Sequence, residues 1–257
     1  MKKTTCVVIP IYQNKLDEYE KLSLAQGLKI LSHYPISIIK PESLDLSCIQ
    51  KQYPQIKVES FDDQYFKGIY GYNKLMLSSV FYERFLQYDY ILIYQLDVWV
   101  FRDKLEYWCD KDYDYIGAPW IVKPKYKLLP LRIFIWLKSG YYKLIRKVFD
   151  HELLGNKVGN GGFSLRKVQP FYQSTMKQQE KIAYYLVHCK TKPVFNEDVF
   201  WAVENPDFRY PSFEEALQFS FDRHPQICFK MNNNELPFGC HGWTKPHNIN
   251  FWKDIIL

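Results

Sequence analysis

The chain has 257 residues, a length that suits one large domain, and 47% of them are hydrophobic, which is enough for a buried core. Its formal net charge of +6 is local, because residues 119–149 hold eight basic side chains and no acidic one. This distribution argues against a protein that coats nucleic acid over its whole surface and favours a single basic docking segment.

The first 120 residues alternate between strand and helix patterns. β-branched and apolar runs predict strands at 5–11, 36–39, 56–61 and 90–96. Apolar residues at helical spacing predict helices at 15–34, from 43 onward and at 73–86. Because the strands are apolar throughout and separated by helices, they predict a mostly parallel central sheet with helices on both faces. Ligands of such sheets bind beyond the carboxyl ends of the strands.

The second half of the chain is less regular. We predict strands at 113–119 and 163–166, a helix at 168–188 and another helix that begins near 196. No linker composition or internal repeat divides the sequence. We therefore expect one α/β domain over residues 1–257, with a basic, aromatic-rich insertion at about 121–149.

Two segments whose residues could bind a ligand or a metal lie at predicted strand boundaries. Asp97 follows the most apolar strand, where a carboxylate can hold Mg²⁺ or Mn²⁺ against a diphosphate, although an ordinary turn-capping aspartate explains it equally well. Gly161 and Gly162 precede another strand and permit close approach of a ligand. An Asn-Gly turn is the simpler explanation of that pair.

Two further segments lie near the end of the chain. Glu197 and Asp198 open a predicted helix, where paired carboxylates can supply a general base. Helix capping accounts for the same pair and is favoured when these residues are taken alone. His241, between glycines and followed by Lys245, offers imidazole to a metal and ammonium to a phosphate, with a structural loop histidine as the alternative.

Taken together and in this order, the segments resemble the GT-A glycosyltransferases. Gln95-Leu96-Asp97 stands where those enzymes carry Asp-x-Asp, and HGWTKP is similar to the His-x-x-Gly-x-x-Lys-Pro signature of glycogenin-like galactosyltransferases with its glycine displaced. NEDVFW resembles the Glu-Asp motif of inverting enzymes. QLDxxVF, YDYIGAPW, GNGGFSLR and EDVFW resemble an uncharacterised bacterial family over nearly the whole chain. The resemblance implies a single GT-A-like, Rossmann-like domain.

The resemblance also implies a nucleotide-sugar donor, with a UDP-sugar favoured, and a divalent cation, Mn²⁺ or Mg²⁺. The donor-side residues that it assigns are Pro10 and Tyr12 for the base, Gln95 near the ribose or a metal-bound water, Asp97 and His241 for the metal, and Lys245 for the diphosphate. Lys74 is a further phosphate candidate, for which a solvated helix lysine is the simpler explanation. Because Gln95 replaces the first acid of Asp-x-Asp, we expect a metal that binds weakly or is dispensable.

On the acceptor side, the resemblance assigns Asn160, Gly161 and Gly162 to sugar contacts, Trp120 to stacking on the acceptor, and Asp198, or else Glu197, to the base. The hypothesis is an inverting hexosyltransferase that acts on a hydroxyl of a glycan or lipid-linked acceptor in polysaccharide or lipopolysaccharide synthesis. Retention of configuration stays open. A sugar nucleotidyltransferase and an inactive carbohydrate-binding protein are the alternatives. The enzyme hypothesis requires Asp97 and His241 to converge on one cleft.

We expect a cytoplasmic protein that is either soluble or peripheral on the inner face of the membrane. The six cysteines form no C-x-x-C pair, the N-terminal apolar stretch is short for a signal peptide, and no run approaches the roughly 20 apolar residues of a spanning helix. In the basic segment, an apolar stretch at 128–137 and an amphipathic pattern at 141–149 suit an anionic membrane surface, while an apolar face packed on the domain explains them equally well. Nucleic acid is not an expected partner, because the segment matches no recognised module.

Overall fold

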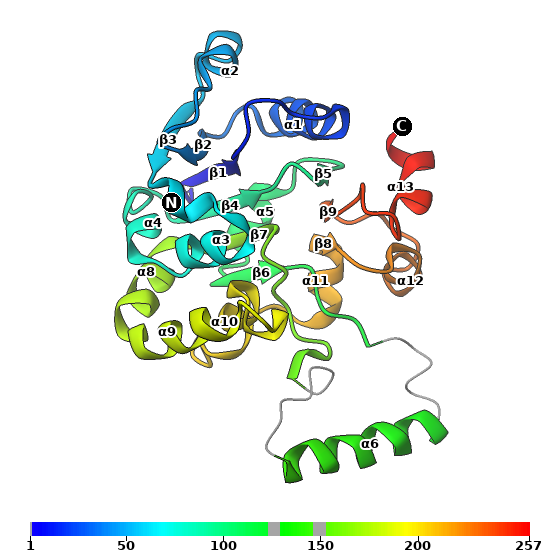
Figure 1. The fold of residues 1–257 in the computed structure, drawn as a ribbon. Helices are drawn as coiled ribbons and strands as arrows, with labels where there is room; N and C mark the ends of the chain where they lie inside the picture. Colours follow the sequence, from blue (N-terminus) through cyan, green and yellow to red (C-terminus); the bar gives the residue numbers. More distant parts are fainter. Residues whose placement is uncertain (1, 123–128, 146–152) are drawn as a thin grey trace.

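The computed structural model describes residues 2–122, 129–145 and 153–257, and its centre is a six-stranded sheet of order β3-β2-β1-β4-β7-β6 (Figure 1). The strands are β1 (Thr5–Pro10), β2 (Ile36–Pro41), β3 (Lys57–Phe61), β4 (Tyr90–Tyr94), β6 (Tyr115–Gly117) and β7 (Phe163–Lys167). Strands β1 to β4 pair in parallel, whereas β7 runs antiparallel to both of its neighbours. The predicted mostly parallel sheet is confirmed.

Helices cover both faces of this sheet. They are α1 (Glu18–Leu31), α2 (Ser47–Gln52), α3 (Gly68–Met76), α4 (Ser79–Glu83), α5 (Leu105–Asp110), α8 (Val168–Lys177), α9 (Gln179–His188) and α10 (Glu197–Val203), with short 3₁₀ turns η1 (Asp63–Phe66) and η3 (Pro193–Phe195). Because successive strand residues point to opposite faces, β1 feeds two cores. Val7 and Ile9 pack with α1 and α5, whereas Cys6 and Val8 pack with α3, α4 and α8.

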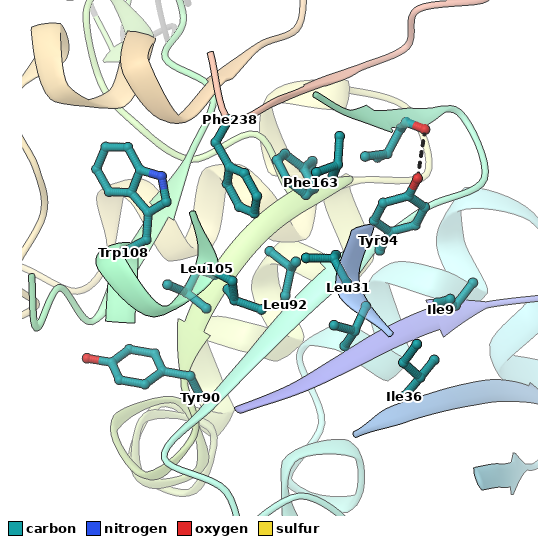
Figure 2. Close-up of a cluster of buried hydrophobic side chains, with 14 of the residues drawn as sticks. Ile9, Leu31, Ile36, Tyr90, Leu92, Tyr94, Leu105, Trp108, Phe163 and Phe238 are labelled. Atoms are coloured by element: carbon teal, nitrogen blue, oxygen red, sulfur yellow. Dashed lines mark hydrogen bonds between the residues drawn. The ribbon is translucent and has the colours of Figure 1, made fainter. Parts of the chain in front are cut away.

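Figure 2 shows the first of these cores, to which β4 and β7 contribute Leu92, Tyr94 and Phe163. Leu92 and Phe163 are fully buried there, and each such side chain stabilises the fold by about 1.5–3 kcal/mol relative to full exposure. Tyr94 is buried as well, and its hydroxyl donates a hydrogen bond of 2.7 Å to the carbonyl oxygen of Ser23. That bond satisfies the polar tip, so an aromatic ring with a hydroxyl is tolerated inside the core.

A second, three-stranded sheet joins the end of the chain to the main sheet. Its order is β5-β9-β8, from β5 (Val98–Val100), β9 (Gly239–His241) and β8 (Ser220–Phe221). Around it lie α11 (Phe213–Phe219), α12 (Pro225–Met231) and α13 (Ile249–Ile256), as Figure 1 shows. In the antiparallel β5–β9 ladder Val98 pairs with His241. This register brings His241 beside Asp97, the residue that precedes β5.

Three predicted helices differ from the structure. The helix expected at 73–86 is two helices, α3 and α4, divided where the Ser78 side chain caps α4 by accepting a bond from the backbone N–H of Phe81. The helix expected at 168–188 is also two, because Gln178 leaves the helical conformation and donates to Asn205 at 2.7 Å. The helix expected from Ser43 begins at Ser47 instead.

The predicted insertion at 121–149 lies partly outside the described residues. Within it the structure describes α6 (Leu129–Leu144), a helix of sixteen residues. Figure 1 draws α6 apart from the two sheets and the helices that cover them.

Candidate active site

The carboxyl ends of β1 and β4 open into a cavity of about 890 Å³, a volume typical of small-molecule sites. Its lining comes from the ends of β1 and β9, the segments that follow β1, β4, β8 and β9, the loop before β7, and residues of α1, η1, α3 and the start of α10. The predicted site residues that line it are Pro10, Tyr12, Gln95, Asp97, Asn160, Gly161, Gly162, Glu197, Asp198, His241 and Lys245. Residues distant in sequence therefore share one cavity.

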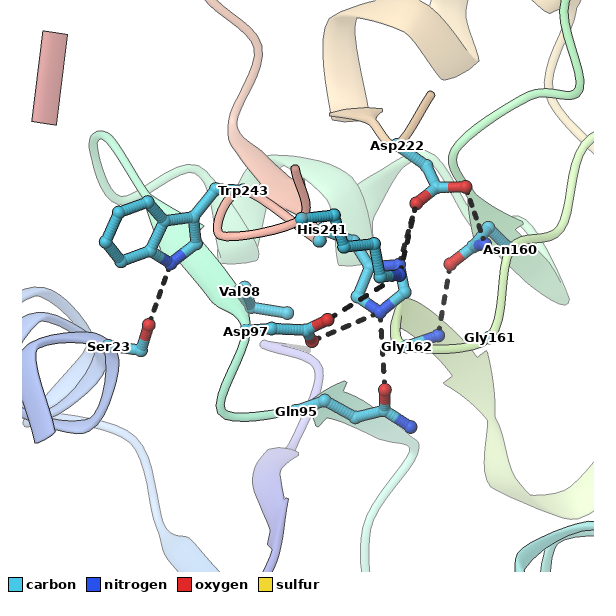
Figure 3. A network of polar contacts seen from close by, with 12 residues as sticks. Ser23, Gln95, Asp97, Val98, Asn160, Gly161, Gly162, Asp222, His241 and Trp243 are labelled. Carbon is cyan, nitrogen blue, oxygen red and sulfur yellow. Dashed lines mark hydrogen bonds and ion pairs between the residues drawn. The ribbon is translucent and has the colours of Figure 1, made fainter. Parts of the chain in front are cut away.

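Asp97 and His241 are in contact inside this cavity. Nε2 of His241 lies 3.2 Å from a carboxylate oxygen of Asp97 and 3.3 Å from Oε1 of Gln95 (Figure 3). Its other ring nitrogen, Nδ1, lies 3.1 Å from Asp222. The required convergence of Asp97 and His241 is confirmed, and its physical cause is the β5–β9 register.

The three groups shift one another's protonation equilibria. Burial by itself lowers the pKa of His241, but Asp97 and Asp222 outweigh that effect and raise it to about 9. For Asp97, burial raises the pKa, whereas His241 and then Lys245 lower it, to a net value of about 2. At neutral pH this cluster consists of an imidazolium between two carboxylates.

Lys245 adds a second positive charge to the cluster. Its ammonium nitrogen lies 3.7 Å from Asp97 and 4.0 Å from Asp222. The loop that carries Lys245 turns at Gly242, whose φ of 63° is in the left-handed region that favours glycine. The amide of Asn248 donates to the carbonyl oxygens of both Asp222 and Gly242, at 2.6 and 2.9 Å, so the loop is fixed at its base.

The two glycines before β7 make room for side chains of the site itself. A Cβ at Gly162 would collide with the imidazole of His241, and a Cβ at Gly161 would collide with the carboxylate of Glu197. Asn160 fixes the same loop, because its amide donates to Asp222 at 3.1 Å and its Oδ1 accepts from the backbone N–H of Gly162 at 3.2 Å. The glycines therefore serve close packing rather than a simple turn.

The start of α10 is held in place by two buried side chains. Asn73 accepts a hydrogen bond from the backbone N–H of Glu197 and donates one to the side chain of Asn196, each at 3.0 Å. Arg166 is fully buried, and its Nη2 lies 3.2 Å from both carboxylate oxygens of Glu197. The guanidinium compensates the buried charge of Glu197, which otherwise would be expensive to desolvate.

Asp198 differs from its neighbour in having no arginine partner among the described residues. It is half-buried on the cavity wall, and its carboxylate accepts a hydrogen bond from the N–H of Val199 at 2.9 Å. Burial, and then the negative charge of Glu197, raise its pKa to about 7. A carboxylate whose pKa lies near neutrality is suited to general base catalysis.

Two predicted site residues lie outside the cavity lining. Lys74 donates to Gln64 Oε1 at 2.7 Å, and its ammonium lies 5.6 Å from the centre of the Tyr65 ring. Trp120 is half-buried and packs against the buried cluster that includes residues of α8 and α10. These contacts explain both side chains without a role in ligand binding.

Three residues at the site were not assigned a role from sequence. Asp222 follows β8, so the strand-end argument that found Asp97 applies to it, but a two-residue strand gives little sequence signal. Arg166 lies in a quoted motif, yet its full burial is visible only in the structure. Asn73 carries no sequence signal that distinguishes it from a surface helix residue.

Solved glycosyltransferases share this architecture. Galactosyltransferase LgtC, solved with donor and acceptor sugar analogs, has a TM-score of 0.53 at 11% identity, covering 98% of this chain and 95% of that one. GlyE of Streptococcus pneumoniae TIGR4 has a TM-score of 0.52 at 12% identity, covering 99% and 60%. The bifunctional glycosyltransferase WbbM has a TM-score of 0.51 at 15% identity, covering 94% and 46%. These similarities establish the GT-A-like fold.

Sequence comparison places the chain in a family. A comparison with curated proteins found no match. A family model described as "Protein of unknown function (DUF5672)" matches residues 55–241, a segment that contains Asp97, Asp198, Asp222 and His241. Because the match spans well over half of the sequence, this chain belongs to the DUF5672 family.

Proposed function

We propose that this protein is a glycosyltransferase that moves a sugar from a nucleotide-sugar donor to a hydroxyl of a glycan or lipid-linked acceptor. The observation that carries the proposal is the sharing of one cavity by two cationic groups, His241 and Lys245, and a carboxylate with a near-neutral pKa, Asp198. The fold that it shares with LgtC and GlyE supports the same activity. A UDP-sugar is the donor we favour.

The cationic side of the cavity suits a diphosphate. Lys245 keeps about two-fifths of its side chain exposed, so its ammonium is accessible to a ligand. The positive charges of Lys245 and of the His241 imidazolium stabilise negative charge that develops on a leaving nucleoside diphosphate. Pro10 ends β1 and Tyr12 lies just after it, at the same edge of the sheet. The exposed ring of Tyr12 offers a face for a nucleotide base.

The same cluster fits a divalent cation with a small donor set. Asp97, Gln95 Oε1 and His241 Nε2 converge, and Asp222 supports the imidazole through Nδ1, as is common behind metal-bound histidines. Among the described residues no group of three or more His, Cys, Asp or Glu side chains forms a metal centre. A bound Mn²⁺ or Mg²⁺ would neutralise charge on the diphosphate. A cation would have to displace the Nε2 proton of the His241 imidazolium and would then have one carboxylate and two neutral ligands, so weak binding is expected.

Asp198 is the proposed base of an inverting single displacement. Its carboxylate takes the proton of the acceptor hydroxyl, the oxygen forms a bond to the anomeric carbon, and the bond from that carbon to the diphosphate breaks. Glu197 is held by Arg166 and fixes the position of Asp198 at the start of α10. Asn160 is proposed to contact the sugar at the cavity wall, together with the backbone of Gly161 and Gly162.

The test compares nucleotide-sugar turnover with nucleotide-sugar binding. Release of nucleoside diphosphate is measured over a panel of nucleotide sugars, with Mn²⁺ and with chelator, while thermal shift reports binding. We expect at least one donor to be hydrolysed or transferred, and Asp198→Asn to keep binding while losing release. Asp207→Asn, which changes an exposed aspartate elsewhere, is the matched control.

The result also separates the alternatives. Binding without turnover in the wild type would indicate an inactive sugar-binding protein, and release of pyrophosphate would indicate a nucleotidyltransferase. Unchanged turnover in Asp198→Asn would remove the assigned base. The anomeric configuration of the product decides between inversion and retention.

A further inference from the structure

Helix α6 exposes large apolar side chains along most of its length. They are Leu129, Ile133, Phe134, Trp136, Leu137, Tyr141 and Leu144. Their exposed fractions run from 49% at Ile133 to 72% at Trp136 and 81% at Leu144. A group of this size in so short a helix marks an interaction surface, because soluble proteins seldom leave such apolar surface in water.

These exposed residues lie on one side of α6. At about 100° per residue, the seven positions fall within a single arc of about 160°. Outside the arc, Leu131, Ile135 and Tyr142 are half-buried. These three residues are apolar as well but partly covered, so α6 is a helix that turns an apolar side to solvent.

The charge of the segment indicates the kind of partner. The sequence from 119 to 149 contains eight basic residues and no acidic one, and Arg132, Lys138 and Lys143 belong to α6 itself. Two copies of such a surface would bring like charges together, which disfavours self-association. A surface that is both apolar and negatively charged matches the helix, and an anionic lipid bilayer combines these two properties.

We propose that α6 is a docking helix that lies flat on an anionic membrane surface. Its apolar arc enters the boundary between headgroups and acyl chains, and Trp136 and Tyr141 are side chains suited to that depth. A helix of sixteen residues is shorter than the roughly 20 residues that cross a bilayer. No helix in the described part of the chain combines the length and hydrophobicity needed to cross one.

Membrane contact by α6 does not depend on the proposed reaction, but its consequence for the acceptor rests on the proposed function. A glycosyltransferase held at a membrane would meet a lipid-linked acceptor at high local concentration. The docking helix would then favour lipid-linked acceptors over free glycans.

The test is sedimentation of the full-length chain with lipid vesicles. We expect it to bind vesicles that mix phosphatidylglycerol with phosphatidylcholine, to bind pure phosphatidylcholine weakly, and to be released by salt. The double variant Trp136→Glu/Leu137→Glu should reduce binding at least about tenfold, because it places charge on the apolar arc. Met176→Glu/Val187→Glu is the matched control, since it changes apolar residues that are 49% and 65% exposed on α8 and α9.

Several outcomes would overturn the proposal. Equal binding to neutral vesicles would contradict the role of charge, and unchanged binding by the α6 variant would contradict the surface. A dimer in light scattering that the α6 variant dissociates, without vesicle binding, would assign the face to a second copy. A cooperative thermal unfolding transition of the α6 variant would serve as the control that it is folded. Nucleoside diphosphate release measured without vesicles tests the proposed function separately, so either proposal can fail alone.

Discussion

Replacing Asp198 by asparagine should stabilise the protein at alkaline pH while abolishing transfer. The folded state raises the pKa of Asp198 from 3.8 to about 7, first through burial and then through the charge of Glu197. The ionised carboxylate is thus less favourable in the folded chain than in the unfolded one. Below the unfolded pKa the Asp198 carboxyl is protonated in both states and does not destabilise the fold. As pH rises from there through about 7, the free energy of unfolding falls.

The size of the effect follows from that shift. One pKa unit corresponds to about 1.4 kcal/mol, so the shift sets an upper limit of about 4 kcal/mol on the cost of ionising Asp198. Contact with solvent in the cavity and the sharing of charge with Glu197 reduce it, and we expect about 1–3 kcal/mol above pH 8. Asparagine keeps an oxygen that can accept from the N–H of Val199, so that hydrogen bond is retained.

The assay is urea unfolding of the wild type, Asp198→Asn and the control Asp207→Asn between pH 4 and pH 9. The expected gain in unfolding free energy for Asp198→Asn is near zero at the acid end and largest at the alkaline end. A gain that does not change with pH, or a variant less stable than the wild type at pH 8, would refute the reasoning.

Three other predictions follow from the same geometry. Gly162→Ala places a methyl group against the neighbouring imidazole and should lower the free energy of unfolding by about 1–3 kcal/mol in urea titrations, whereas Gly140→Ala, whose Cβ meets no atom within 4 Å, should not destabilise. Arg166→Met leaves Glu197 buried without its counter-charge and should lower the free energy of unfolding by about 3–5 kcal/mol, most of which should be regained when Glu197→Gln is added. Unchanged stability in Arg166→Met would contradict this. Nucleoside diphosphate release should rise with pH through about 7, because the base acts deprotonated, and should fall near pH 9 as the His241 imidazolium loses its proton; a flat profile would argue against Asp198.

The parts of the fold that depend on local pattern were predictable. Runs such as Val7 to Ile9 and Ile91 to Tyr94 are apolar at every position, which signals strands buried on both faces. The position of Asp97 then follows from the rule that sites lie beyond the carboxyl ends of strands. The break between α8 and α9 was missed because Gln178 leaves the helix for a tertiary bond to Asn205 that no local pattern records, whereas the break before α4 has a local signal in the Ser78 cap.

The parts of the site that depend on distant contacts were not predictable. Asp222 reaches His241 through the pairing of β8 with β9, which joins very short strands. The glycines at 161 and 162 suggested a turn or ligand contact, whereas their neighbours are side chains of the site itself. Lys74 was a phosphate candidate from the resemblance, but it donates to Gln64, and neither residue is part of the cavity lining.

The central claim is that a diphosphate binds beside the cluster of Asp97, His241 and Lys245, and calorimetric titration with UDP tests it directly. We predict that the wild type binds and that Lys245→Ala weakens binding about tenfold or more, the usual effect of losing a charge-assisted contact. Lys253→Ala, an exposed lysine of α13, should bind as the wild type does. Equal affinity in Lys245→Ala and the wild type would contradict the account.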